Sequence, residues 1–220
     1  MAFSIAGSAA ALTVNFVDGT LYNTTALTGY QTNGDDMDGM TVVATLSDTT
    51  TQALTWATTG SGTGGVTGTD WSLGVNGDTF GDNTWTLSFN SSSLTLTNLF
   101  IDAGNGDTVF DVVNGSNRSP GSALGKPFDT GYTGDLTATY ADRVAVGGML
   151  YGDLYRTLKL DFGSNGFGGV MNFTADTDNL KFAGDIEPVN PVPEPATLLL
   201  LGTGLIGIAG SQRKKFFRKS

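Results

Sequence analysis

A period of two in the placement of apolar residues is the feature that most constrains how this chain can fold. Between residues 12 and 187, apolar and polar side chains alternate, as in 40–46 (MTVVATL) and 85–89 (WTLSF). Further alternating runs occur at 12–16, 94–101, 136–144, 156–162 and 170–175. Because successive side chains of a β-strand point to opposite faces, this pattern predicts strands with one buried face. No stretch of this range shows a convincing helical period of 3.6 residues.

Sheets that each have one apolar face must cover each other. We therefore predict an all-β fold, a single antiparallel β-sandwich of about 8–12 strands with a jelly-roll-like arrangement. Glycine supplies 32 of the 220 residues, and Gly, Asn and Asp gather between the alternating runs, where they favour turns. We expect 58–70 and 114–127 to be long surface loops, and 12–187 to form one domain.

The composition excludes several classes of function. The chain contains no cysteine and no histidine, which removes disulfides, thiol nucleophiles, Ser-His-Asp triads and the usual ligands of transition metals. We therefore expect a protein that is not an enzyme. Residues 1–195 carry 6 basic and 21 acidic groups, a net charge of −15. Such a surface repels nucleic acid but suits an exported domain or one that binds divalent cations.

The N-terminal segment 1–11 is small and apolar, and it ends in Ala9, Ala10 and Ala11. Small residues in this arrangement are typical of a signal peptidase cleavage region. We interpret 1–11 as the remnant of a secretory signal peptide, which implies the export machinery and signal peptidase as partners. The alternative is a first strand with a small-residue lead-in.

The C-terminal end has three parts in a fixed order. A proline-rich spacer, 188–195, contains Pro193, Glu194 and Pro195 and cannot continue a strand or helix. The uncharged segment 196–212 follows, and as a helix it would be roughly 25 Å long, barely enough to span a hydrocarbon core. The tail 213–220 is basic and is expected to remain cytoplasmic. Its cations are Arg213, Lys214, Lys215, Arg218 and Lys219.

This order resembles the PEP-CTERM sorting signal of exported proteins in Gram-negative bacteria. The tripeptide 193–195 matches its Pro-Glu-Pro, 196–210 (ATLLLLGTGLIGIAG) its Leu/Gly-rich helix, and 213–215 (RKK) its basic stop. The resemblance covers about 29 residues. It implies processing by an exosortase, a membrane-embedded peptidase, with the inner membrane as a transient anchor and the cell surface or extracellular polysaccharide as the destination.

Acidic residues form clusters in three glycine- and asparagine-rich stretches, which favour Ca²⁺ ligation because that ion prefers carboxylate and amide oxygens. The candidate calcium ligands are Asp35, Asp36, Asp38, Asp102, Asp107, Asp176 and Asp178, with Asn105, Asp111 and Asn179 in the same stretches. The first stretch is not an EF-hand loop, because position twelve counted from Gly34 is Thr45. The alternative is that these side chains stabilise turns between strands.

Three hypotheses of function follow. The first is a non-catalytic structural protein of the cell surface or exopolysaccharide matrix. The second is a calcium-dependent carbohydrate-binding or adhesive module, in which Trp56, Trp71, Tyr132 or Tyr151 stack on sugar rings. The third, a secreted glycan hydrolase, requires a pair of carboxylates across a cleft, and no pair is singled out by the sequence.

Overall fold

The fold is all-β, as the alternation predicts. The computed structural model describes residues 12–29, 31–113, 118–122, 124–180 and 186–189. The strands of the first half are β1 Leu12–Phe16, β2 Tyr22–Thr24, β3 Leu27–Gly29, β4 Thr41–Leu46, β5 Thr51–Thr55, β6 Ala57–Gly60, β7 Thr63–Thr67, β8 Trp71–Asn76 and β9 Trp85–Phe89. Those of the second half are β10 Leu96–Asp102, β11 Thr108–Asp111, β12 Asp129–Thr130, β13 Leu136–Val146, β14 Leu154–Asp161, β15 Gly169–Thr174, β16 Thr177–Leu180 and β17 Glu187–Pro188. Two short 3₁₀ turns, η1 Gly34–Asp36 and η2 Ala103–Gly106, interrupt them.

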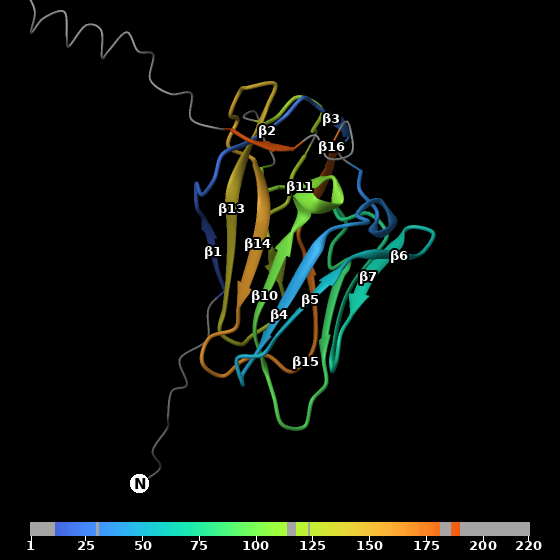
Figure 1. Cartoon of the computed structure of the whole chain (residues 1–220), viewed down its shortest axis with the longest axis vertical. Coiled ribbons are helices and arrows are strands. Elements are labelled where there is room, and N and C mark those ends of the chain that lie inside the picture. Colours follow the sequence, from blue (N-terminus) through green and yellow to red (C-terminus); the bar gives the residue numbers. More distant parts are fainter. Residues whose placement is uncertain (1–11, 30, 114–117, 123, 181–185, 190–220) are drawn as a thin grey trace, which may run out of the picture. The chain divides into compact units, whose positions relative to one another are not determined.

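The larger sheet is built around the long strands β13 and β14. Its main order is β17-β2-β13-β14-β10-β4-β5, and β1 also pairs with β13. β14 pairs with β13 along one edge, and along its other edge it pairs first with β10 and then with β11. β11 also pairs with β16, and β16 pairs with β3 (Figure 1). The pairings of β1 and β2 with β13 are parallel, which the expectation of a purely antiparallel fold did not include.

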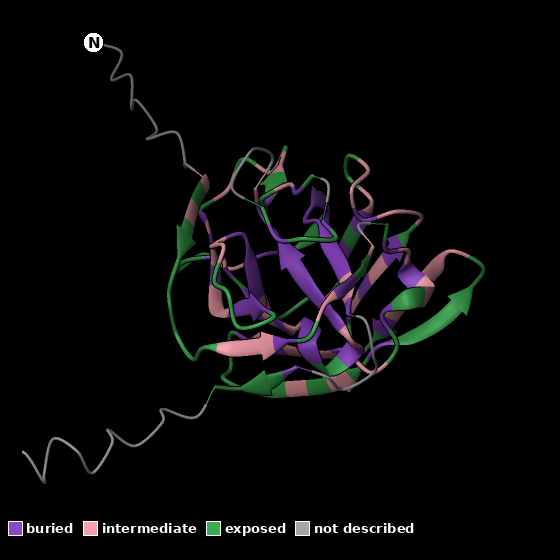
Figure 2. Cartoon of the chain, turned by 90° about the horizontal axis from the view of Figure 1, so that it is seen from above, coloured by how far each residue is buried: buried purple, intermediate pink, exposed green. Residues whose placement is uncertain are grey.

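The smaller sheet has the order β12-β15-β9-β8-β7-β6, and its pairings are antiparallel. Its apolar side chains and those of the larger sheet contribute to the same core cluster. Trp85 of β9 lies at the centre of this cluster, with ring centroids 5.6 Å from Trp56, 5.5 Å from Phe173 and 6.5 Å from Phe110. Figure 2 shows the buried residues in the middle of the molecule, with exposed residues on the outer strands and loops.

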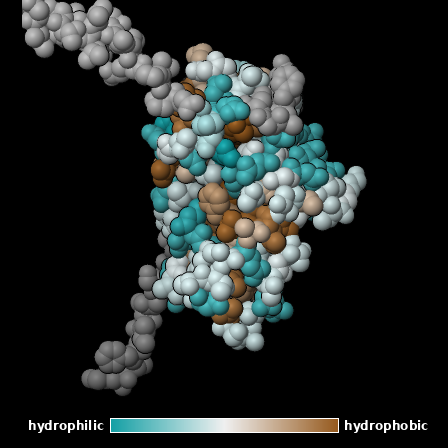
Figure 3. All heavy atoms as spheres, in the orientation of Figure 1, coloured by the Kyte–Doolittle hydropathy of each residue, from teal (hydrophilic) through white to brown (hydrophobic). Residues whose placement is uncertain are grey.

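The predicted alternation matches the burial of the strands closely. In β4 and β9, every second residue is buried, and the intervening residues are partly or fully exposed. On the outward faces these intervening residues are largely Thr and Ser, which combine high β-propensity with solubility. Figure 3 accordingly shows a surface that is mostly pale or teal, with brown apolar areas of limited extent.

One expected loop is a hairpin instead. Residues 58–70 contain the end of β6 and all of β7, which pair antiparallel, and β7 continues the sheet onto β8. The second expected loop, 114–127, contains no strand among those of its residues that the structure describes.

The glycines of this hairpin are needed for a close approach of two backbones. The turn η1 packs on β7 so that a Cβ at Gly34 would lie 2.5 Å from the Gly64 nitrogen, and a Cβ at Gly64 would overlap the Gly34 carbonyl oxygen. That same carbonyl accepts a 2.8 Å hydrogen bond from Trp56 Nε1. A side chain at either position would therefore push η1 away from the core tryptophan.

We predict that Gly64→Ala destabilises the domain by about 3 kcal/mol, the upper part of the range for overpacking, because the obstructing atoms are backbone. Urea unfolding monitored by tryptophan fluorescence measures the change. Gly29→Ala is the matched control, since a Cβ there would meet nothing within 4 Å. Equal stabilities of the two variants would contradict the packing argument.

The terminal expectations fall outside the described residues. These are the signal remnant 1–11, the segment 196–212 and the basic tail 213–220. Within the described part of the chain, no helix is long and apolar enough to cross a membrane. The chain divides into two units between Pro188 and Val189, and only Val189 of the C-terminal unit is described.

Candidate metal centre

Four aspartates are fully buried in one region of the larger sheet. Asp111, Asp153, Asp176 and Asp178 each have a relative exposure of 0%. Carboxylate oxygens of Asp111, Asp176 and Asp178, one from each, lie within 4.8 Å of one another. The electrostatics of Asp153 also act on Asp111 and Asp178, so all four belong to one acidic region. Burial of so much like charge is unfavourable unless protons, donors or a cation compensate it.

Strand pairing brings these residues together. The short strand β11 lies between β16 and β14, at the end of the fold that also carries β3 (Figure 1). On one side the Asp111 amide donates to the Asp176 carbonyl at 3.0 Å. On the other side the Val112 amide donates to the Asp153 carbonyl, also at 3.0 Å. Asp178 follows Asp176 by two residues and is paired with Val109 of β11.

The carboxylates of Asp111 and Asp153 each accept two hydrogen bonds from described residues. Asp111 accepts hydrogen bonds from the Val113 amide at 3.1 Å and from the Ser122 hydroxyl. Asp153 accepts from the Ser119 hydroxyl at 2.8 Å and from the Ser119 amide. Both serines belong to the segment 118–122, which therefore covers the acidic region. Gly125 allows this cover to lie close, because a Cβ there would overlap Asp111 Oδ1.

The other two carboxylates have oxygens without donors. Asp176 accepts one bond, at 3.2 Å from the Thr79 hydroxyl through Oδ1, while its Oδ2 is buried without a partner. Neither oxygen of Asp178 receives a hydrogen bond of normal geometry, although its carboxyl group lies close enough to Asp111 and Ser122 for both to influence its titration. Within the described residues, no Lys or Arg forms an ion pair with any of the four aspartates. Among the described residues, no basic side chain thus neutralises these carboxylates.

The titration of these groups reflects that environment. Burial, reinforced by the negative charges of Asp178 and Asp111, raises the pKa of Asp176 to about 9. Burial and the charge of Asp111 raise the pKa of Asp178 to about 8. Burial also raises the pKa of Asp111, against the lowering effect of its bond from Ser122. Without a cation, protons are held at this site near neutral pH.

We predict that the chelator-treated protein becomes less stable between pH 5 and pH 8. An unfolded aspartate titrates near 3.8 whereas folded Asp176 and Asp178 titrate near 9 and 8, so in this window the folded state binds more protons. The free energy of unfolding then falls as pH rises, by a few kcal/mol, and the loss levels off above the folded pKa values. Urea unfolding in EDTA at both pH values measures it. Asp178→Asn, which cannot ionise, should flatten the dependence; an unchanged slope would contradict the assignment.

Most of the other acids singled out from the sequence have structural partners. Asp36 Oδ2 accepts from the Asn33 amide at 2.8 Å, which caps η1. Asp35 Oδ2 accepts from the Gly62 amide at 2.8 Å, and Asp38 Oδ1 accepts from the Thr58 hydroxyl at 2.8 Å. Asp35 and Asp38 thus tie the η1 region to the β6–β7 hairpin while Asp36 caps η1 itself, in line with the alternative that these side chains stabilise turns.

The second acidic stretch is divided by the structure. Asp102 forms a two-bond ion pair with Arg156, at 2.8 and 3.0 Å, and Asn105 Oδ1 accepts from the same guanidinium at 2.9 Å. Asp107 adopts a left-handed conformation, with φ 55°, at the end of η2. Asp111, in the same stretch, is the member that reaches the buried region.

The sequence analysis placed Asp176 and Asp178 in one acidic stretch and named Asp111 in another without listing it as a candidate ligand, and it did not single out Asp153. The signal for Asp176 and Asp178 is their spacing of two residues. The available signal for Asp111 was its place directly after Val109 and Phe110, inside a strand, where an aspartate is unusual. Nothing in the sequence indicates Asp153, which lies next to β11 only because β14 pairs with it.

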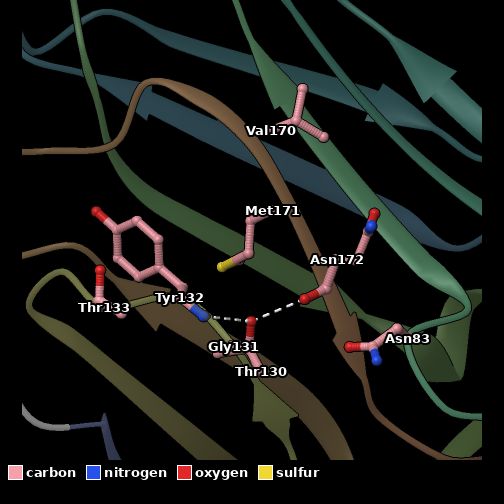
Figure 4. A pocket seen from close by; sticks show the side chains of 8 residues that line it. All are labelled: Asn83, Thr130, Gly131, Tyr132, Thr133, Val170, Met171 and Asn172. Carbon is pink, nitrogen blue, oxygen red and sulfur yellow. Dashed lines mark hydrogen bonds between the residues drawn. The ribbon is translucent and has the colours of Figure 1, made fainter.

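A second feature is a hollow of about 460 Å³ on the smaller sheet, beside β15 and β12. Figure 4 shows Tyr132, Met171, Asn172 and Asn83 around it, with the Thr130 hydroxyl accepting from the Tyr132 amide at 3.2 Å and donating to the Asn172 carbonyl at 2.7 Å. Tyr132 is one of the aromatics proposed from the sequence to stack on sugars. By contrast, Trp56 and Trp71 are 1% and 3% exposed and belong to the core.

Comparison with known proteins identifies the C-terminal end. The family model of the PEP-CTERM protein-sorting motif matches residues 191–214. No curated protein and no solved structure matches the chain.

The class of protein follows from that match: the chain is an exported protein with a C-terminal sorting signal. More narrowly, it is targeted to an exosortase, which is its processing partner, and its processing is a transient event at the membrane. The resemblance of 193–195, the apolar segment and the basic stop to this signal is therefore confirmed.

Proposed function

We propose that the processed protein is a non-catalytic structural component of the cell surface or of the extracellular polysaccharide matrix, with a β-sandwich as its ectodomain. The observation that carries this proposal is the sorting motif at 191–214 directly after an all-β domain. The last described strand, β17, pairs with β2 and so fixes the start of the proline-rich spacer to an edge of the larger sheet. This arrangement suits a folded module that is released or attached through its C-terminal end.

Several properties of the domain support a structural role. The two sheets share one core, and their outward faces are rich in threonine, which gives a stable and soluble module. The buried aspartates have no exposed surface, whereas glycoside hydrolysis requires two carboxylates that flank a substrate cleft. The hollow beside β15 has no carboxylate among its lining residues.

The intact mass of the protein recovered from the surface and medium of its native host tests this proposal. We expect a mass that lacks everything after the region of Pro193–Pro195, and any added mass would identify an attached lipid or glycan. A mass that still includes Arg213 to Ser220 would instead indicate a retained membrane protein and would overturn the proposal.

A second candidate function is carbohydrate binding at the hollow of Figure 4. The specific observation is the combination of one aromatic ring with two amide side chains, Asn83 and Asn172, around an open depression. Sugar sites commonly combine a ring that stacks with amides that hydrogen-bond to hydroxyls. The Tyr132 ring is supported from behind by edge contacts with Phe162 and Phe167, at centroid distances of 6.2 and 5.6 Å.

Retention of the protein on extracellular polysaccharide from its host tests the second function. The double variant Asn83→Ala and Asn172→Ala should lose retention if the hollow binds sugar. Thr59→Ala, on the exposed strand β6, is the control for a surface change elsewhere. Equal retention of all three proteins would place any sugar contact away from this hollow.

A further inference from the structure

The buried aspartates require either bound protons or a bound cation to neutralise their charge. Asp178 has both carboxylate oxygens buried without a donor, and Asp176 has one. Leaving a buried charged group unpaired is among the most costly features that a fold can contain. The same three residues, Asp111, Asp176 and Asp178, bring one oxygen each to within 4.8 Å of the others, close enough for the three oxygens to share one ion.

We propose that Asp111, Asp176 and Asp178 bind one Ca²⁺ ion, which joins β11 to β16 and completes the fold of the ectodomain after export. The ligands are all carboxylate oxygens, and three of them provide a formal charge of −3 for a divalent ion. Asp153 adds a further negative charge near the site while its own oxygens are held by Ser119. This proposal does not depend on whether the mature protein is structural or binds sugar.

The chemistry of the ligand atoms indicates which ion the site would bind. The chain has no Cys and no His, so thiolate and imidazole ligands are absent, and hard cations that prefer oxygen remain. Ca²⁺–O distances of about 2.3–2.6 Å let oxygens as far apart as about 5 Å share one ion. Mg²⁺, at about 2.0–2.1 Å, would require the oxygens to close to about 4.2 Å and would retain several waters. The limit of 4.8 Å is compatible with Ca²⁺ without movement of the oxygens, and a fully buried region favours Ca²⁺ because Mg²⁺ usually retains several waters.

The position of the site explains why an ion there would act on the whole domain. Asp111 lies 65 residues before Asp176 in the sequence, so binding closes a long stretch of chain. The segment 118–122 meets the same region through Ser122, and Gly125 lies against Asp111. On the core side, Ala175, next to Asp176, accepts a 2.8 Å hydrogen bond from Trp85 Nε1. The ion would therefore connect β11, β16, the covering segment and the tryptophan core.

Export gives the proposal a biological setting. The sorting motif sends the domain out of the cell, where calcium modules typically bind with dissociation constants of about 10⁻⁴–10⁻³ M. A site of that strength would fill outside the cell and not before.

The experiment is a calcium titration of the full chain in mild detergent after treatment with EDTA. Isothermal titration calorimetry should give about one ion per chain for the wild type, and about 10 mM Ca²⁺, 100 times a Kd of about 10⁻⁴ M, should raise the melting temperature by about 5–10 °C. Mg²⁺ at the same concentration should give a smaller rise. If the chelated chain does not fold, recovery of its near-UV circular dichroism on addition of Ca²⁺ is the equivalent supporting result.

Two variants localise the effect. Asp178→Asn keeps the shape of the side chain but removes its charge, and it should weaken calcium binding at least tenfold. In EDTA at neutral pH the same variant should melt at or above the wild-type temperature, because asparagine removes the cost of protonating a buried aspartate on folding. Asp129→Asn, on exposed β12, is the matched control and should bind as the wild type does.

Two results would overturn the proposal. One is the absence of bound calcium and of any change in melting temperature for the wild type, which would leave the aspartates protonated instead. The other is undiminished calcium binding by Asp178→Asn, which would assign the ion to another acidic part of the chain. Neither result bears on the intact-mass experiment, so the proposed surface role is tested separately.

Discussion

Replacing Pro193, Glu194 and Pro195 together by alanine is expected to leave the chain unprocessed and in the membrane fraction. These residues lie in the matched sorting motif, directly before the apolar segment. Prolines hold a segment extended and keep it out of helices, whereas alanine is the best helix former. The substitution thus removes the residues that give the motif its name and allows a helix to extend into the spacer. We expect at least a tenfold drop in processed protein, measured by fractionation and mass spectrometry.

The control for this experiment lies immediately outside the matched motif. Val189→Ala with Asn190→Ala alters the same spacer but leaves 191–214 intact, and this variant should be processed normally. Normal release of the triple-alanine variant would contradict a role for the tripeptide in sorting. Loss of processing in both variants would indicate that the conformation of the whole spacer, and not the tripeptide, controls the step.

Trp85→Ala is expected to lower the free energy of unfolding by about 4 kcal/mol and the melting temperature by about 8–16 °C. Trp85 is fully buried, and its ring contacts Trp56, Phe110 and Phe173, so the side chain touches residues outside its own sheet. Alanine would leave a large cavity between the sheets. It would also leave the Ala175 carbonyl without the indole N–H that bonds to it at 2.8 Å. Calorimetry and urea unfolding in the presence of Ca²⁺ measure the loss.

Trp85→Phe separates the two contributions. Phenylalanine retains much of the volume but cannot donate to Ala175, so we expect a loss of about 1–2 kcal/mol. Val170→Ala, at a side chain 69% exposed on β15, should change stability by no more than about 0.5 kcal/mol. If Trp85→Ala were as mild as Val170→Ala, the tryptophan could not be the centre of a shared core.

The success of the strand predictions has a local cause. Side chains in a strand alternate between faces, so the order of apolar and polar residues in a stretch such as 40–46 indicates by itself which residues face the core. The structure buries Met40, Val42, Ala44 and Leu46, as that alternation requires. The predictions needed no knowledge of which strand lies beside which.

The hairpin at 58–67 was missed for the opposite reason. A run of Gly, Ser and Thr has low apolar content and resembles a loop, because glycine weakens a strand when nothing else acts on it. Gly64 belongs in this strand because η1 passes so close that no Cβ fits between them. That contact joins residues distant in the sequence, and it overrides the local propensity.

The sequence by itself determined the all-β class, the inward and outward faces of the main strands, the sorting signal and the pairing of Asp176 with Asp178. Each of these depends on residues that are close together in the chain. Only the tertiary structure decided the parallel pairings of β13, the place of Trp85 between the sheets, and the arrival of Asp111 and Asp153 beside Asp176. These depend on which strands pair across long stretches of chain. Which strands pair depends on how the whole core is buried, and no local sequence pattern indicates it.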